Sequence, residues 1–236
     1  MWKAVPRNSK CGPQCCYHRS PFPTKPGPGV GHISLAAIQW DDEDSLMQHN
    51  TIRDQIWLLV GIGVPELLHL SPQQYMETLS YDAEPTCPEY RNRFDLPVMV
   101  DTRLPFSDLL SKAGIINYLD LDAISHISNS HLGPYVYCTH DSRKYSSHTA
   151  ATAIAAFTPD EEGCTLQELA FFYLFYPQLF EGIAIDAIQT HFRDSYHPCI
   201  VKVTAKAEIG AHWHDDLTSG IHILSKGKRL FSFNIA

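Results

Sequence analysis

The sequence PCIVKVTAKAEIGAHWH, residues 198–214, gives the clearest indication of fold class in this 236-residue chain. It is rich in β-branched and apolar residues, and it contains two segments, 200–205 and 209–214, that are each typical of a β-strand. Two more runs of this kind follow over 220–225 and 230–235, and turn-forming residues divide the runs at positions 215–216 and 226–227. The pattern predicts a C-terminal antiparallel β-meander.

Before this stretch, the sequence contains several signals that mark the start of a helix. Ser71 can cap the first free amides of a helix that begins at Pro72, and Gln74 can reach back to the Ser71 amide, which predicts a helix over 72–80. The same signal occurs twice more, as Thr158-Pro159-Asp160-Glu161 and as Thr165-x-x-Glu168. The last of these opens the apolar stretch 169–176, so we expect three helix starts in all.

Shorter elements complete the prediction. Apolar residues at helical spacing from 46 to 60 predict a helix that Gly61 ends, with the acidic cluster 41–44 before it. The runs 96–100 and 135–139 are typical of strands, and the alanine-rich run 149–157 is typical of a helix. N-terminal helices and short strands followed by a C-terminal meander indicate the α+β class rather than a doubly wound fold.

The first 30 residues differ from the rest in composition. They hold five basic residues and no acidic one, together with six prolines and three glycines, and they show neither helical nor alternating periodicity. Such a composition predicts a disordered, basic, Pro/Gly-rich arm over 1–30. The formal charge of the whole chain is −8, so residues 31–236 are strongly acidic. We expect these residues to form a single α+β domain.

Composition also indicates the cellular compartment of the protein and the classes of partner that it can bind. The longest apolar run covers only nine residues, 56–64, whereas a membrane-spanning helix needs roughly 20, so we expect no membrane span. Seven scattered cysteines and no apolar segment after the basic N-terminus predict reduced thiols in a cytoplasmic protein. An acidic body disfavours nucleic acid as a partner, except through the arm. A protein or a small-molecule ligand remains as the expected partner.

Several motifs of known chemistry are missing from the sequence. It contains no Gly-x-x-x-x-Gly-Lys-Ser/Thr phosphate loop, no Gly-x-Ser-x-Gly nucleophile elbow and no Cys-x-x-Cys pair. The glycines at 61 and 63 follow a helical pattern rather than a strand, and Glu66 stands where a dinucleotide fingerprint has glycine.

One constellation could hold a metal ion. His212 and His214 would point to the same face of a strand, and Asp216 and His222 follow at short distances, with His191 as a further donor. Imidazole and carboxylate are ligands of zinc, so one interpretation of His212, His214, Asp216 and His222 is a divalent-metal site. The spacing resembles the His-x-His-x-Asp of metallo-β-lactamase-like hydrolases, although Leu217 stands where that motif has another histidine. The alternative is a set of exposed or hydrogen-bonded strand histidines.

Two weaker pairs accompany this constellation. Cys138 and His140 lie two residues apart and could form a nucleophile with its base, but a buried inert thiol is the simpler interpretation. His191 and His197 could form an acid/base pair, although 13 histidines in one chain make such neighbours common by chance.

The order of several short motifs resembles an uncharacterised bacterial family of domain-of-unknown-function proteins, over roughly residues 46–230. The matching features are a helical segment at 55–60 and motifs at 63–66, 70–72, 96–98, 133–135, 140–143, 165–168, 176–177 and 209–213. The resemblance implies a compact intracellular α+β protein and no established activity or catalytic residue. The sequence departs from the family in the arm and in the histidine cluster around His212.

No complete catalytic motif assigns a function. We therefore expect a soluble, intracellular, non-enzymatic binding or interaction domain. The alternative is a metal-dependent, hydrolase-type enzyme that uses the His-x-His-x-Asp cluster of the C-terminal sheet, with a divalent ion such as zinc as its cofactor.

Overall fold

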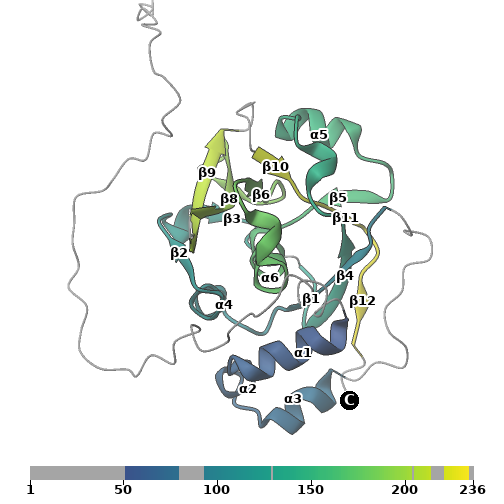
Figure 1. Ribbon diagram of the computed structural model, residues 1–236, viewed down its shortest axis with the longest axis vertical. Helices are drawn as coiled ribbons and strands as arrows, with labels where there is room; N and C mark the ends of the chain where they lie inside the picture. Colours follow the sequence, from purple (N-terminus) through teal and green to yellow (C-terminus); the bar gives the residue numbers. More distant parts are fainter. Residues whose placement is uncertain (1–50, 80–92, 129, 204, 214–220, 234–236) are drawn as a thin grey trace, which may run out of the picture. The chain divides into compact units, whose positions relative to one another are not determined.

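The computed structural model describes residues 51–79, 93–128, 130–203, 205–213 and 221–233 (Figure 1). All of them belong to one unit, Asp42–Ala236. The arm predicted for residues 1–30 and the acidic cluster 41–44 lie outside the described residues.

The expected α+β class is confirmed, with helices and two sheets whose strands concentrate in the C-terminal half. The helices are α1 (Ile52–Gly61), α2 (Val64–Leu67), α3 (Pro72–Thr78), α4 (Phe106–Ala113), α5 (Ala150–Ala156) and α6 (Leu166–Phe175). Three short 3-10 helices add to them: η4 (Leu121–Ala123), η5 (Arg143–Tyr145) and η6 (Pro177–Phe180).

Both sheets mix strands from distant parts of the chain. The first contains β1 (Leu96–Asp101), β4 (Pro134–Thr139), β5 (Glu161–Gly163), β11 (Ser225–Gly227) and β12 (Phe231–Ser232). The second contains β2 (Ile115–Asn117), β3 (Ile124–Ser125), β6 (Ala184–Asp186), β7 (His191–Phe192), β8 (Tyr196–Val203), β9 (Lys206–Trp213) and β10 (Ile221–Ile223).

Two of the predicted helix starts are present as complete capping boxes. At α3 the Gln74 amide donates to Ser71 Oγ at 3.2 Å, and the Ser71 amide donates to the Gln74 side chain at 2.9 Å. At α6 the Glu168 amide donates to Thr165 Oγ1 at 3.3 Å, and the Thr165 amide donates to Glu168 Oε2 at 2.8 Å. Local side-chain chemistry therefore determines where both helices begin.

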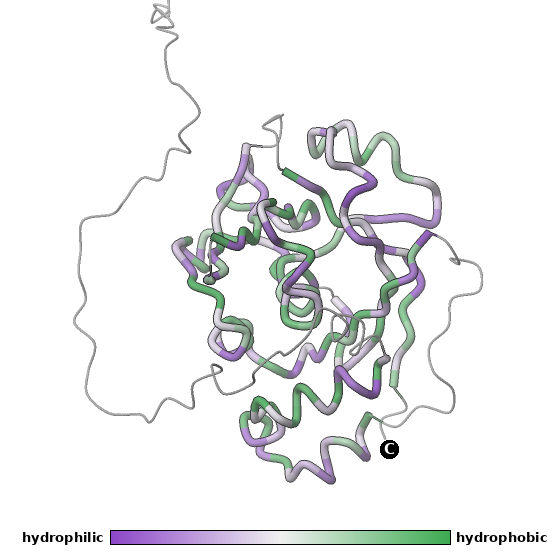
Figure 2. The backbone as a smooth tube through the Cα atoms, in the orientation of Figure 1, coloured by the Kyte–Doolittle hydropathy of each residue, from purple (hydrophilic) through white to green (hydrophobic). Residues whose placement is uncertain are grey.

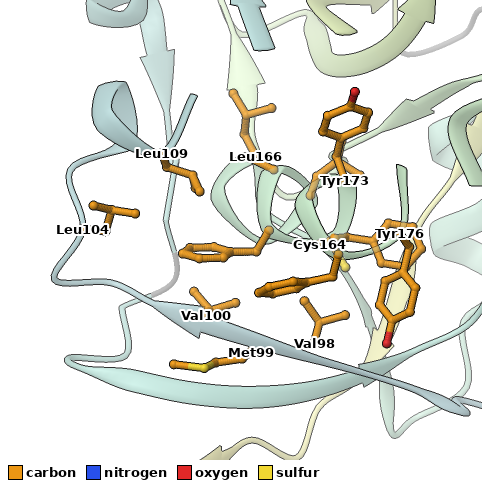
Figure 3. Packing of buried hydrophobic residues seen from close by; sticks show 14 of the residues in the cluster. Val98, Met99, Val100, Leu104, Leu109, Cys164, Leu166, Tyr173 and Tyr176 are labelled. Atoms are coloured by element: carbon orange, nitrogen blue, oxygen red, sulfur yellow. The ribbon is translucent and has the colours of Figure 1, made fainter. Parts of the chain in front are cut away.

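Helix α6 lies in the core and contacts strands of both sheets, β1 and β8 (Figure 1). Nine of its ten residues are buried, and Figure 2 colours the backbone of this segment by hydropathy. Val98 and Val100 point from β1 toward the helix, where Leu166, Tyr173 and Tyr176 belong to the same apolar cluster (Figure 3). Because every side of α6 meets protein, its sequence is apolar nearly all round.

The prediction of a helix that starts at Thr158 is wrong. The chain turns there, with the Glu161 amide donating to the Thr158 carbonyl at 3.0 Å, and then enters β5. The Glu161 carboxylate accepts from Lys144 Nζ at 2.8 Å and from the Tyr145 hydroxyl at 2.9 Å. These distant partners hold the segment as a sheet strand, so tertiary contacts override the local start signal.

The C-terminal strands do not follow the neighbour-to-neighbour order of a meander. Only β8 and β9 form the expected antiparallel hairpin, from Tyr196 opposite Trp213 to Val203 opposite Lys206. Strand β10 instead pairs in parallel with β6, while β11 and β12 pair with β4 in the first sheet. Strand propensity predicts that these segments are strands, but burial against distant partners decides where they pair.

Among the described residues, no helix combines the length and the apolarity that crossing a bilayer requires.

Candidate metal centre

Strands β6, β8 and β9 bring three possible metal ligands to one face of the second sheet. Asp186 lies opposite Cys199, and Cys199 lies opposite Gly210. His212 follows Gly210 by two residues and therefore points to the same face. Asp186, Cys199 and His212 thus meet across three neighbouring strands, and we call them the ligand cluster.

The distances within the ligand cluster are short. Asp186 Oδ1 lies 2.8 Å from His212 Nδ1, and Cys199 Sγ lies 3.9 Å from His212 Nε2. One ligand atom from each residue can be chosen so that all three lie within 4.8 Å of one another. Among the described residues, this is the group of at least three histidine, cysteine or acidic side chains that comes together in this way.

The opposite face of the same strands anchors the cluster. Ile185, Ile200 and Ile209 alternate with the cluster positions and are buried in the main core. The apolar face therefore fixes the register, because a slip by one residue would turn the isoleucines outward. Gly210 adds space next to the thiol, since a Cβ at that position would lie 3.4 Å from Cys199 Sγ.

Burial and charge shape the chemistry of the three groups. Asp186 and Cys199 are buried, whereas 24% of the His212 side chain is exposed. Burial raises the pKa of the Cys199 thiol, and the hydrogen bond with His212 only partly offsets this effect. Burial lowers the pKa of His212, but the hydrogen bonds with Asp186 and Cys199 outweigh it and hold that pKa well above its ordinary value.

A carboxylate, a thiolate and an imidazole together form a ligand set that suits Zn²⁺. Three protein ligands leave the fourth tetrahedral position open, which is the arrangement of catalytic rather than structural zinc sites. The same residues also resemble a catalytic triad. Cys199 would be the nucleophile, His212 its base, and Asp186 the group that orients the base. The cluster can therefore support either of two chemistries.

The four residues predicted as metal ligands do not come together in the structure. His212 belongs to the ligand cluster, whereas His214 and Asp216 lie outside the described residues. His222 lies opposite Ile185 in the parallel β6–β10 pair, which places it on the other face from Asp186. Its Nδ1 is 3.3 Å from Ser142 Oγ instead. The structure therefore does not bring His222 and His212 together.

His191 and His197 lie close to the cluster without joining it. His197 is directly opposite His212 and is buried, and its Nδ1 donates to the Thr190 carbonyl at 3.1 Å. The His191 ring packs on the His197 ring with 5.1 Å between the centroids. A carbonyl acceptor at Nδ1 fixes the tautomer of His197, as it does for histidines near metal sites.

Sequence reasoning missed Asp186 and Cys199. A signal for Asp186 was present, since it interrupts the otherwise apolar run of residues 183–188. A buried acid between isoleucines needs a partner, and that need could have marked the position. Cys199 carries no such signal, because only strand pairing shows that it meets Gly210 and His212.

Cys138 and His140 do not form a nucleophile and its base. The predicted burial of Cys138 is confirmed, and the residue packs in a cluster with Phe94. The Ser142 amide donates to His140 Nδ1 at 2.9 Å, so the neutral ring carries its proton on Nε2 and donates to Ser225 Oγ at 2.8 Å. Burial lowers the pKa of His140 to about 4, with Lys144 adding to the effect. Both ring nitrogens are thus engaged in a structural network.

Comparisons with protein-family models, with curated proteins and with solved structures find no match to this chain. The resemblance to a bacterial family of unknown function stays a prediction, and the ligand cluster carries the case for a function.

Proposed function

We propose that this chain is a zinc-binding protein with hydrolase-type chemistry, in which Asp186, Cys199 and His212 hold the ion. The observation that carries the proposal is the convergence of three different ligand types within 4.8 Å on one sheet face. An ion in an open three-ligand site supplies a Lewis acid and lowers the pKa of a bound water toward neutrality.

The burial of the cluster favours an ion over a bare nucleophile. Cys199 is only 1% exposed, whereas reactive cysteines sit in partly exposed surroundings so that a substrate carbon can reach the sulfur. A metal ion needs only ligand atoms within reach. The His212 side chain is 24% exposed, so one side of the ligand cluster can face solvent.

Metal content of the purified full-length chain tests this proposal. We expect about one zinc per chain, and a loss of affinity of at least about tenfold for Cys199→Ser, Asp186→Asn and His212→Gln. His222→Gln is the matched control, because His222 lies on the opposite face, and it should keep the native affinity. Absence of stoichiometric zinc from the unmutated protein, or equal affinities in all variants, overturns the proposal.

Hydrolysis is tested separately on the same samples. We expect slow cleavage of an activated ester such as p-nitrophenyl acetate. A chelator should abolish this cleavage, and added zinc should restore it. If the protein binds zinc stoichiometrically but shows no chelator-sensitive cleavage of activated esters or phosphodiesters, it has a metal site without hydrolase chemistry.

A cysteine-dependent acyl transfer is the second candidate, and the 3.9 Å separation of Cys199 Sγ from His212 Nε2 supports it. This candidate predicts that iodoacetamide alkylates Cys199 in the metal-free protein faster than Cys138 or Cys164, as mass spectrometry would show. It also predicts that His212→Gln slows the reaction. Equal labelling of the three buried thiols contradicts it.

The expectation of a non-enzymatic interaction domain stays a prediction, as does a cytoplasmic location. Neither the comparisons nor the described surface identifies a partner for such a domain.

A further inference from the structure

A cavity of about 420 Å³ lies beside α5 and β5. The apolar part of its lining consists of Ile154, Phe157 and Ile188. The charged part consists of Glu161, Glu162 and Lys228. None of the three residues of the ligand cluster lines this cavity. Its volume lies within the range of small-molecule sites, roughly 300–1,000 Å³.

The apolar wall offers surface that a ligand can cover. Ile154 is 52% exposed, although large aliphatic side chains are usually buried, and Phe157 is half-buried. Both side chains border the cavity. A ligand with an apolar group would remove them from water, and this burial favours binding.

The two carboxylates in the lining differ in how their charges are balanced. The Glu161 side chain is fully buried, and its carboxylate accepts from Lys144 Nζ at 2.8 Å. The Glu162 side chain is 28% exposed, and its Oε1 lies 3.1 Å from Lys226 Nζ, which also pairs with Glu168. One ammonium group therefore faces two carboxylates. The second carboxylate oxygen of Glu162 has no hydrogen-bond partner among the described residues, so it can accept from a ligand.

Lys228 supplies the opposite charge. This side chain is exposed, and its Nζ donates to the Pro159 carbonyl at 2.7 Å. In the described part of the chain, no carboxylate pairs with this ammonium group. The half-buried Gln189 also lines the cavity, and its side-chain amide has no partner within the same part of the chain. The cavity thus offers a carboxylate acceptor, an unbalanced cation and an amide.

We propose that this cavity is a ligand site of its own, which binds an apolar α-amino acid such as L-phenylalanine or L-leucine. The ammonium group of the amino acid pairs with Glu162, and its carboxylate pairs with Lys228. Its side chain covers Ile154 and Phe157. Charge complementarity selects this class, because an apolar amine would leave Lys228 without a counter-charge and an apolar acid would leave Glu162 without a donor. The site does not involve the ligand cluster, so it does not depend on the proposed metal centre.

Isothermal titration calorimetry of the full-length chain with five small molecules tests this proposal. L-Phenylalanine and L-leucine should bind at least about tenfold more tightly than glycine, because only they have an apolar side chain to bury. Phenethylamine lacks the carboxylate, and 3-phenylpropionate lacks the ammonium group. Each should bind about tenfold more weakly than L-phenylalanine, since one charged hydrogen bond is lost. No binding of L-phenylalanine, or equal affinities for L-phenylalanine and glycine, overturns the proposal.

Two variants assign the two charged contacts. Lys228→Met should weaken the binding of L-phenylalanine about tenfold and leave that of phenethylamine unchanged. Glu162→Gln should weaken the binding of L-phenylalanine by a similar factor and leave that of 3-phenylpropionate unchanged. Lys206→Met is the matched control, because Lys206 is also an exposed lysine and lies in β9, outside the cavity lining. Equal effects of Lys228→Met and Lys206→Met, or equal losses for all ligands in one variant, overturn the proposal.

Cys199→Ser distinguishes the cavity from the metal centre, since amino acids also bind metal ions through their amino and carboxylate groups. We expect this variant to keep the native affinity for L-phenylalanine. A loss of affinity in Cys199→Ser, together with native affinity in Lys228→Met, would place the amino acid on the metal ion and overturn the cavity site. Failure of the chain to bind zinc would overturn the proposed metal centre and leave the expectations for this cavity unchanged.

Discussion

Asp186 and His212 lie on strands that are not neighbours, yet the carboxylate Oδ1 and the imidazole Nδ1 are 2.8 Å apart. Strand β8 runs between β6 and β9, so the His212 ring reaches across it toward Asp186. Cys199 lies on this intervening strand, next to the ring. Gly210 faces Cys199 from β9, and a Cβ at this position would lie 3.4 Å from the thiol sulfur.

Side-chain volume at Gly210 should control access to the thiol. We expect Gly210→Ala to be tolerated, because the added Cβ would meet Cys199 Sγ at an ordinary contact distance of 3.4 Å. Gly210→Val adds methyl groups closer to the sulfur and should weaken zinc binding by about tenfold, measured by competition with a chromophoric chelator. Ala211→Val, on the other face of the strand, is the control. Equal losses in Gly210→Val and Ala211→Val would contradict the expectation.

The buried pair of Lys226 and Glu168 should respond differently to single and double substitution. Both side chains are fully buried, and Glu168 also accepts from the Tyr135 hydroxyl at 2.7 Å. Lys226→Met leaves the carboxylate without its counter-charge and should lower the free energy of unfolding by about 3–5 kcal/mol in urea titrations. Adding Glu168→Gln should restore part of this loss. A double variant that is less stable than Lys226→Met would show that the charge is not the cause.

His140 should make the protein less stable in mild acid. Its pKa is lowered from 6.5 to about 4, so between these values the unfolded chain binds a proton that the folded chain does not. The free energy of unfolding should therefore fall as the pH drops through this window, by about 2 kcal/mol from neutrality to about pH 5. Urea titrations of His140→Gln should show a shallower fall. A parallel fall in both proteins would contradict the assignment.

The two capping boxes should differ in their contribution to stability. Thr165 is buried at the start of α6, whereas Ser71 is exposed at the start of α3. Removing the Thr165 hydroxyl leaves the buried Glu168 amide without this acceptor, so Thr165→Ala should cost about 1–2 kcal/mol. Ser71→Ala is the matched comparison and should cost less, because water can replace its hydroxyl. Thermal unfolding of the two variants gives the order.

Gly163 and Ile188 should be coupled energetically. A Cβ at position 163 would lie 2.5 Å from Ile188 Cγ1, which is closer than two carbons can approach. Gly163→Ala should therefore cost about 1–3 kcal/mol. In the background of Ile188→Ala the same change should cost at least about 1 kcal/mol less, which a double-mutant cycle measures. Strict additivity would show that the backbone at Gly163, not the close contact, causes the loss.

Local sequence signals predicted the elements whose causes are local. The capping boxes at Ser71 and Thr165 place the starts of α3 and α6 correctly, and the apolar runs around residues 96–100 and 135–139 coincide with β1 and β4. Thr158 carries the same start signal and begins no helix. Lys144 and Tyr145, which are 17 and 16 residues from Glu161 in the sequence, hold Glu161 in β5 instead.

Part of the candidate site could be found in the same way. Alternation along the strand marked His212 as a side chain that shares a face with other ligands. Its actual partners were not predictable, because Asp186 and Cys199 are 26 and 13 residues away in the chain. His222, which is closer in sequence, lies on the opposite face of the sheet from Asp186.

Local sequence patterns predict the α+β class, the starts of two helices, the burial of α6 and most of the C-terminal strands, although the turn expected at 226–227 is part of β11. These properties follow from side-chain periodicity and from hydrogen bonds between residues three or four positions apart. Three features follow from tertiary contacts alone: the pairing of β10 with β6, the place of β11 and β12 in the first sheet, and the convergence of Asp186, Cys199 and His212. Those contacts depend on which apolar faces are buried together, and that choice is made by the whole chain at once.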